Sequence, residues 1–240
     1  MPRFFCNPPE DNHTVISGED ARHITQVLRR KPGEILTLCD GRGFDYRGVI
    51  TGISPQAVTL EVNEKTPTQS ESSLRVRLYQ CLLKGDGFET IIQKAVELGV
   101  TEIRPVTSTF CVARPAKDSL DAKRQRWQKI SLSAAKQCGR GIIPEILPIC
   151  ALADCAPYFA LRDTLFFYEG GGAPVSDYVN FKSTQLNIII GPEGGFSPEE
   201  AELVQQNGAK AVTLGKRILR AETAPLAALA VIMHLTGNLG

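Results

Sequence analysis

No stretch of this 240-residue sequence approaches the roughly 20 consecutive apolar residues that a membrane-spanning helix needs. The N-terminal residues 1–5 lack the apolar core that a secretory signal peptide carries. The seven cysteines are odd in number and show no CxxC spacing, which argues against a disulfide framework and against a zinc site. We therefore expect a cytoplasmic protein without membrane contact, in which most cysteines are buried thiols.

The sequence also lacks an excess of charge of either sign. It has 27 basic and 26 acidic residues, so its net charge is only +1. A nucleic-acid partner is therefore not indicated by charge alone. Between Arg114 and Arg140, however, eight lysines and arginines accompany two aspartates, a stripe that can form an electrostatic footprint for phosphate. The histidines His13, His23 and His234 lie far apart, and no clustered His, Cys, Asp and Glu set suggests a metal.

Residues 1–70 have the pattern of a small β domain with one helix. Ser17 can cap a helix that runs to Arg30 with apolar residues on one face. Three short strands are expected, at Ile35–Cys39, Tyr46–Ile53 and Ala57–Val62. Strands at this spacing predict a β-barrel. The polar stretch Glu64–Ser73 is the candidate linker to the rest of the chain.

From residue 74 onward, strands and helices alternate, which indicates an α/β sheet covered by helices. Strands are expected at Leu74–Leu82, Ile103–Val106, Thr164–Tyr168, Asn187–Ile190 and Ala211–Leu214. Helices are expected after Asp86, at Asp121–Cys138, at Cys150–Leu161, after Ser197 and after Thr223. Asp86, Ser197 and Thr223 are the candidate N-caps of their helices.

Three of these strands end at loops that contain glycine. The loops follow Tyr168, Ile190 and Leu214. A glycine at a strand end lets the backbone approach a ligand without a Cβ in the way, and open α/β sheets bind ligands at the carboxyl ends of their strands. Ordinary turns between strands and helices are the alternative interpretation.

Two strings in this region carry a resemblance to a known family. GPEGGFS (191–197) and LGKRILRAETA (214–224) resemble the C-terminal signature of the small-subunit (16S) rRNA uridine-N3 methyltransferases, which belong to the SPOUT superfamily. HITQVLR (23–29), LLKGDGFETIIQKAVELGV (82–100) and AAKQCGR (134–140) extend the resemblance over nearly the whole chain. Phe110 stands where the family often carries an arginine, which argues against a phosphate contact there.

The resemblance implies a SPOUT-type trefoil-knotted α/β domain over residues 74–240, preceded by a PUA-like β-barrel over residues 1–70 that helps to hold RNA. General topology rules argue against knots, so the knot rests on the resemblance alone. The implied cofactor is S-adenosylmethionine, held by the three glycine-containing loops. The residues expected to bind it are Phe167, Tyr168, Glu169, Gly191, Glu193, Gly194, Gly195, Leu214, Gly215, Ile218 and Leu219. Glu193 has the alternative role of holding its loop in shape.

The reaction that the resemblance implies is methylation of uridine N3, which is a poor nucleophile until its proton leaves. Guanidinium groups can stabilise the resulting anion because they stay charged at physiological pH. We expect Arg220 and Arg140 in this role, and Glu222 as a weaker candidate for proton acceptor. A salt bridge between Arg220 and Glu222 that only fixes their loop is the alternative.

The implied partner is small-subunit rRNA or the ribosomal subunit, and the implied assembly is a homodimer. RNA contacts are expected at Arg3, Arg22, His23, Arg29, Arg30 and Lys84. Three other functions stay open: a SPOUT enzyme that acts on ribose 2′-oxygen or on tRNA, a non-catalytic ribosome-assembly protein, and a nucleotide-binding enzyme. The last is disfavoured because GPEGGF has neither the lysine and Ser/Thr of a P-loop nor the GxGxxG spacing.

Overall fold

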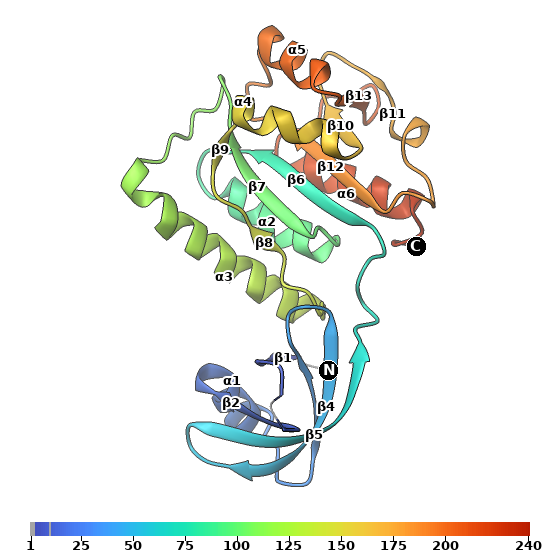
Figure 1. The fold of residues 1–240 in the computed structure, drawn as a ribbon. Helices are drawn as coiled ribbons and strands as arrows, with labels where there is room; N and C mark the ends of the chain where they lie inside the picture. The colour runs from blue at the N-terminus through green and yellow to red at the C-terminus, as the bar shows by residue number, and fades with distance from the viewer. Residues whose placement is uncertain (1–2, 10) are drawn as a thin grey trace. The chain divides into compact units, whose positions relative to one another are not determined.

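A computed structural model describes residues 3–9 and 11–240, and it divides into two compact units (Figure 1). The first unit comprises the chain up to Glu71 together with Ala135–Ile143. The second unit comprises Ser72–Ala134 and Pro144–Gly240. In the described part of the chain, no helix is long and apolar enough to cross a membrane.

The first unit is a curled five-stranded sheet in the order β1-β3-β4-β5-β2. Its strands are β1 (Phe4–Phe5), β2 (His13–Ser17), β3 (Ile35–Cys39), β4 (Phe44–Ile53) and β5 (Ala57–Pro67). Register shifts between β4 and β5, at Arg47/Gly48 and Ile50/Gly52, bend the sheet as β-bulges do. The bent sheet packs around buried apolar side chains that include Ile24, Leu38 and Leu60. The expected strands are confirmed, whereas β1 and β2 were not predicted.

The single helix expected from Ser17 to Arg30 is wrong in its second half. An α-helix, α1 (Gly18–Arg22), passes into a π-helical turn, η1 (His23–Val27). The wider π turn shifts the phase of the helix, so Val27 is exposed although Ile24 is buried. The Ser17 side chain makes no cap hydrogen bond, and Arg29 adopts a positive φ of 52° that a helix cannot continue.

The linker prediction is wrong in part, because residues 64–67 belong to β5. A second difference concerns Ala135–Ile143, which lies in the first unit although the sequence suggested that all of it followed the linker. Hydrogen bonds explain this assignment. Lys136 Nζ lies 2.8 Å from Asp20 Oδ2, and the Gly43 N–H donates to the Gly141 carbonyl at 3.1 Å.

The second unit alternates strands and helices. Its strands are β6 (Arg75–Cys81), β7 (Glu102–Thr107), β8 (Glu145–Ile146), β9 (Cys150–Ala151), β10 (Thr164–Phe167), β11 (Ala173–Pro174), β12 (Gln185–Ile190) and β13 (Lys210–Thr213). Its helices are α2 (Gly87–Glu97), η2 (Lys117–Ser119), α3 (Leu120–Cys138, whose last residues reach the first unit), α4 (Leu152–Cys155), η3 (Ala156–Leu161), η4 (Val175–Asp177), α5 (Pro198–Gln206) and α6 (Thr223–Leu235). The helix expected at Cys150–Leu161 therefore begins as strand β9 and ends as a 3-10 helix.

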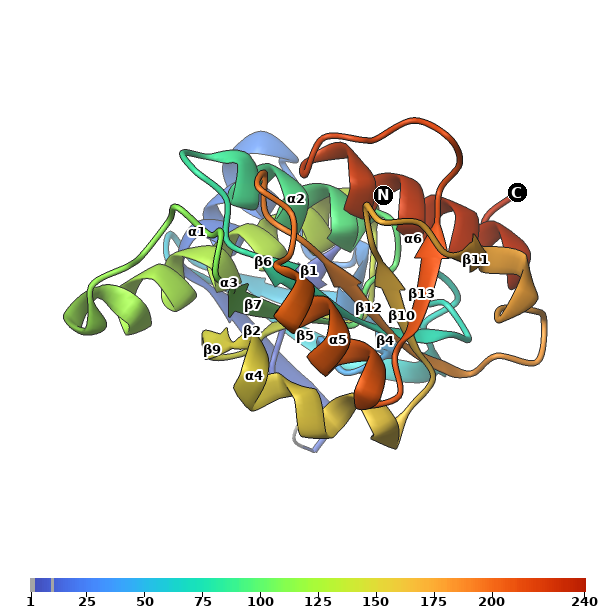
Figure 2. The same ribbon diagram turned by 90° about the horizontal axis from the view of Figure 1, so that it is seen from above.

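The strands of the second unit form a parallel sheet in the order β11-β13-β10-β12-β6-β7-β8. Helices α2 and α6 cover one face, and α4 and α5 cover the other (Figure 2). The central strand β12 is buried from Leu186 to Ile190, which explains its continuous apolar run. The α/β class with a parallel sheet is thus confirmed.

The predicted helix caps have mixed outcomes. Ser197 caps α5 as expected, because its hydroxyl accepts from the Glu200 N–H at 3.2 Å while the Glu200 carboxylate accepts from the Ser197 N–H at 3.1 Å. Asp86 precedes α2 but its side chain makes no cap hydrogen bond. Thr223 lies inside α6, whose N-cap is Glu222.

Candidate active site

A cavity of about 860 Å³ opens in the second unit beside the ends of three neighbouring strands. Parallel pairing of β10 with both β12 and β13 brings their carboxyl ends to one edge of the sheet. The loops that leave these ends line the cavity: residues 167–171 after β10, 190–195 after β12, and 212–222 with Ala224 around the end of β13. The cavity therefore lies where open α/β sheets bind ligands.

A carboxylate joins the first two loops. Glu169 Oε1 accepts a hydrogen bond from the Phe196 N–H at 2.8 Å. Gly195 lies directly against this carboxylate with φ +70°, and a Cβ at that position would collide with Glu169. Glycine is therefore required here for both backbone conformation and space. The phenyl ring of Phe196 packs edge-on against Phe166 of β10 with 4.9 Å between ring centroids, which fixes the loop from below.

Two further carboxylates tie the loop after β12 and the start of α5 to the neighbouring strands. Glu193 Oε1 accepts from the Lys84 N–H, which follows β6, at 3.0 Å. Glu200 Oε1 accepts from the Thr109 N–H, which follows β7, at 2.7 Å. The Glu193 carboxylate thus has the loop-holding contact that was its alternative role, although the residue also lines the cavity.

The loop after β13 is the open wall of the cavity. Ile218 is 85% exposed, and Arg220 and Glu222 both line the cavity. Within the described residues, no ion pair joins Arg220 to Glu222, so the salt bridge considered as their alternative role is not found. Gly87, at the start of α2, lies against Glu222, since a Cβ there would stand 3.3 Å from the Glu222 Cγ.

Cysteine and serine side chains pack together where β6 and β7 end: Cys81 is the last residue of β6, and Ser108 and Cys111 follow β7. Cys111 Sγ lies 3.3 Å from both the N–H and the hydroxyl of Ser108. Hydrogen bonds from the Cys81 thiol and from Ser108 lower the pKa of Cys111 to about 6, while burial raises the pKa of Cys81. Cys81 therefore stays protonated, and its thiol donates to the Ser108 hydroxyl at 3.6 Å.

The structure brings the eleven predicted cofactor residues together, since each of them lines the same cavity. Their role in binding stays a prediction. The sequence missed Lys216 and Arg217, which also line the cavity, although their place in the same loop as Arg220 could have indicated them. It also missed that Phe110 packs on Gly194, where a Cβ would lie 2.9 Å from the Phe110 Cβ. That contact between loops has no signal in the sequence.

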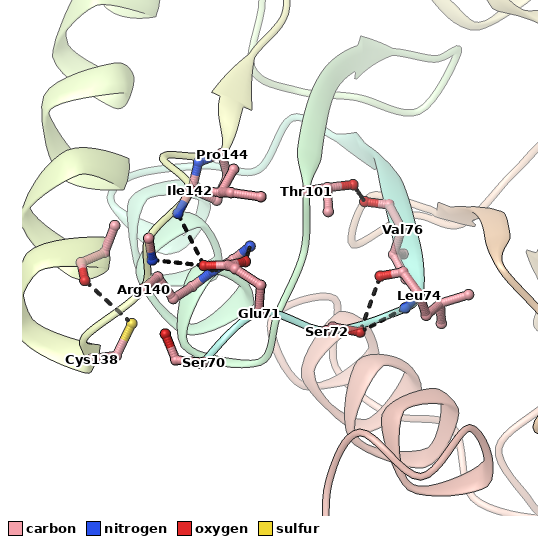
Figure 3. A network of polar contacts seen from close by, with 12 residues as sticks. Ser70, Glu71, Ser72, Leu74, Val76, Thr101, Cys138, Arg140, Ile142 and Pro144 are labelled. Atoms are coloured by element: carbon pink, nitrogen blue, oxygen red, sulfur yellow. Dashed lines mark hydrogen bonds and ion pairs between the residues drawn. The ribbon is translucent and has the colours of Figure 1, made fainter. Parts of the chain in front are cut away.

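Arg140 is the exception among the predicted catalytic residues, because it does not line the cavity. Its guanidinium is buried in the first unit, with Nη2 2.7 Å from Glu71 Oε2 (Figure 3). The other Glu71 oxygen accepts from the N–H groups of Gly141 and Ile142, at 2.8 and 3.0 Å. The structure thus gives Arg140 a place in a packed polar network, and its catalytic role stays a prediction.

The residues predicted to contact RNA differ in their surroundings. Arg22, His23 and Arg29 are exposed on or just after the helical turns of the first unit. Arg3 pairs with Asp45 at 3.0 Å and Arg30 with Glu34 at 2.8 Å. Lys84 is exposed in the second unit, beside the cavity loops through its bond to Glu193. Among the described residues, no group of three or more His, Cys, Asp or Glu could hold a metal ion.

Comparison with protein families places this site in a class. A family model for an RNA methyltransferase domain matches residues 70–233, and one for an RNA methyltransferase PUA domain matches residues 16–63. The protein is therefore an RNA methyltransferase with a PUA domain. More specifically, the chain belongs to the ribosomal RNA small subunit methyltransferase E family, as its relatives show.

The member from Bacillus subtilis is 32% identical over 229 residues, which cover 92% of this chain and 90% of that protein. The member from Mesomycoplasma hyopneumoniae is 34% identical, with coverage of 94% and 96%. The crystal structure of the member from Neisseria gonorrhoeae bound to S-adenosyl methionine is 35% identical, with a TM-score of 0.86 and 98% coverage of both chains.

Proposed function

We propose that this protein transfers a methyl group from S-adenosylmethionine to N3 of a uridine in small-subunit (16S) ribosomal RNA. The observation that carries the proposal is the cavity at the carboxyl ends of β10, β12 and β13, with Arg220 and Glu222 in its wall. Family membership supports the reaction and the class of substrate. The choice of uridine N3 as the target atom is supported by the motifs GPEGGFS and LGKRILRAETA.

The cavity is of a suitable size for the proposed cofactor. Ligand sites in proteins commonly span about 300–1,000 Å³, and this cavity lies within that range. Glycine is required at positions 191 and 195 of this wall, because a Cβ at Gly191 would lie 2.7 Å from the Phe196 ring and one at Gly195 would collide with Glu169. S-adenosylmethionine supplies an activated methyl group on a sulfonium centre. Backbone groups of residues 191–195 and 214–215, with Ile218, Leu219, Phe167 and Tyr168, would hold it.

We propose that Arg220 and Glu222, which both line the cavity, prepare the uracil. The N3 proton must leave before that nitrogen can attack a methyl group. Arg220, which lines the cavity without an ion-pair partner in the described chain, can stabilise the resulting anion. Glu222, two residues further along the same wall, can accept the proton.

The first unit would serve as the RNA-holding domain, with Arg22, His23 and Arg29 as exposed contacts. The match of residues 16–63 to an RNA methyltransferase PUA domain supports this role. We also infer that the β10, β12 and β13 loops form the trefoil knot of SPOUT enzymes. The strand order supports it, because β10 pairs with both β12 and β13, which follow it in the chain. A ribosomal substrate implies a cytoplasmic location.

A homodimer is proposed from α6, which has apolar side chains on opposite faces. Ala228, Leu229 and Ile232 are buried in the second unit, whereas Val231 is 39% exposed. An apolar residue on an outer helix face can be covered by a second copy of the chain. Light scattering of the purified protein would show a mass of two chains. A monomer at micromolar concentration would reject this assembly.

The reaction is tested with small ribosomal subunits from cells that lack this protein. Incubation with the protein and S-adenosylmethionine, followed by mass spectrometry of the rRNA nucleosides, should reveal new 3-methyluridine. A 2′-O-methylated nucleoside would keep the fold and reject the target atom. Cofactor binding without transfer to RNA, free or in subunits, would favour a non-catalytic assembly protein.

A further inference from the structure

The exposed face of α3 is a basic surface that the cavity does not include. A shallow groove of about 390 Å³ runs along it, lined by Ala122, Gln125, Arg126, Lys129, Ile130 and Ser133. Lys123 is exposed at the edge of this face, on the side of the helix nearer the buried Trp127, because residues four apart on a helix share a side. Lys123, Arg126 and Lys129 are spaced three residues apart, so their side chains follow one another along the helix with a rise of about 4.5 Å per step.

The positive charge of this face is only partly neutralised. Arg126 Nη2 lies 2.8 Å from Glu89 Oε2 of α2, in a pair whose arginine side chain is 66% exposed. Lys123 and Lys129 have no ion-pair partner among the described residues. The nearest acidic residues along the chain, Asp118 and Asp121, lie at or before the start of the helix. Two uncompensated cations therefore border a groove without acidic lining.

The start of α2 connects this groove to the wall of the cavity. Gly87 lies against Glu222 of the cavity, and Glu89, two residues further, pairs with Arg126 of the groove. Between them, the Phe88 ring packs on Trp127 of α3 with 4.5 Å between ring centroids. The cavity wall and the basic face are thus separated by a single helical turn. Lys84, exposed before that turn, adds a further cation to the path.

We propose that the face formed by Lys123, Arg126 and Lys129 binds phosphates of the substrate rRNA that flank the target nucleotide. The inference rests on the proposed function, because it assumes that the target base enters the cavity. Polyanionic RNA complements the groove in charge, and the small side chains of Ala122 and Ser133 let a backbone lie close to the helix. The face then sets affinity for the substrate and leaves cofactor binding unchanged.

The test compares two double variants with the same loss of charge. Lys123→Gln/Lys129→Gln removes two cations from the α3 face. Lys182→Gln/Lys210→Gln removes two exposed lysines near the amino ends of β12 and β13, at the sheet edge opposite the cavity. Methyl transfer to 16S rRNA in small subunits is measured at several salt concentrations, with S-adenosylmethionine affinity measured by calorimetry.

Loss of two phosphate contacts should raise KM for the subunit roughly tenfold and lower the slope of log KM against log salt by about 1.4–1.8. The α3 variant should show both changes, with kcat and cofactor affinity as in the wild type, and the control variant neither. Equal KM values for the two variants would overturn the proposal. If the wild type itself transfers no methyl group, the proposed function fails. The role of the α3 face is then tested separately, by measuring the salt dependence of 16S rRNA binding for the wild type and both variants.

Discussion

Arg140 and Arg220 each lie in a glycine-containing turn, but the structure surrounds them differently. In the first unit, Arg140 is 4% exposed and its guanidinium pairs with Glu71, whose carboxylate also accepts from two backbone N–H groups. In the second unit, Arg220 is exposed in the wall of a cavity and has no ion-pair partner among the described residues. A buried, paired guanidinium stabilises a fold, whereas an unpaired one can stabilise charge that develops on a substrate.

The largest effect is expected for Arg140→Ala. The change leaves the Glu71 carboxylate buried without its cation, which should lower the free energy of unfolding by roughly 3–5 kcal/mol. Urea unfolding followed by circular dichroism measures it. The control is Arg30→Ala, which breaks the partly exposed pair with Glu34 and should cost about 0–1 kcal/mol. If the free energy of unfolding fell by the same amount in both variants, Arg140 would be no more important for stability than a surface arginine.

The next effect is expected for Arg220→Ala. If this guanidinium stabilises the uracil anion, kcat should fall by about 10²–10³, as for loss of a donor to a developing anion. Stability and S-adenosylmethionine affinity should stay close to the wild type. Arg220→Lys should recover part of the activity, because it keeps the charge and loses the planar fork. A variant that loses cofactor affinity while kcat is retained would reassign Arg220 to the shape of its loop.

A smaller effect is expected for alanine at one glycine of each region. A Cβ at Gly195 would meet the Glu169 carboxylate, and a Cβ at Gly141 would meet Thr68. Gly195 also has φ +70°, which costs an L-residue roughly 1–2 kcal/mol. We expect calorimetry to show that Gly195→Ala weakens S-adenosylmethionine binding on the order of tenfold. A tenfold loss of affinity corresponds to a free energy within that range. Gly141→Ala should lower stability and leave cofactor affinity unchanged. If both variants lost the same affinity for S-adenosylmethionine, the loops after β10 and β12 would have no special role in binding the cofactor.

The sequence predicted the strands of both units more reliably than the ends of the helices. Strands such as β12 are short apolar runs that stop at glycine, so composition alone marks them. The buried residues of α6 are Pro225, Ala228, Leu229, Ile232 and Met233, whereas the equally apolar Leu226 and Ala230 are only partly buried. The helix is apolar on nearly every side, and periodicity then cannot tell which face meets the sheet.

The candidate site was predicted to the extent that it lies in continuous loops. Residues 191–195 and 214–222 each combine a strand end with glycine, a local signal that needs no knowledge of the fold. Arg140 has the same local signal, and its pairing with Glu71 joins residues 69 positions apart. Contacts of that kind, like that of Phe110 with Gly194, depend on packing between distant segments.

By itself the sequence determined the eight strands β3 to β7, β10, β12 and β13, which loops carry glycine and which family the chain resembles. These features follow from local composition and contiguous motifs. Only the tertiary structure decided that the loops after β10, β12 and β13 surround one cavity. It also decided that Arg220 lies in the cavity wall while Arg140 is neutralised by Glu71. The physical reason is that the surroundings of a charged group are set by its neighbours in space, which local sequence patterns do not encode.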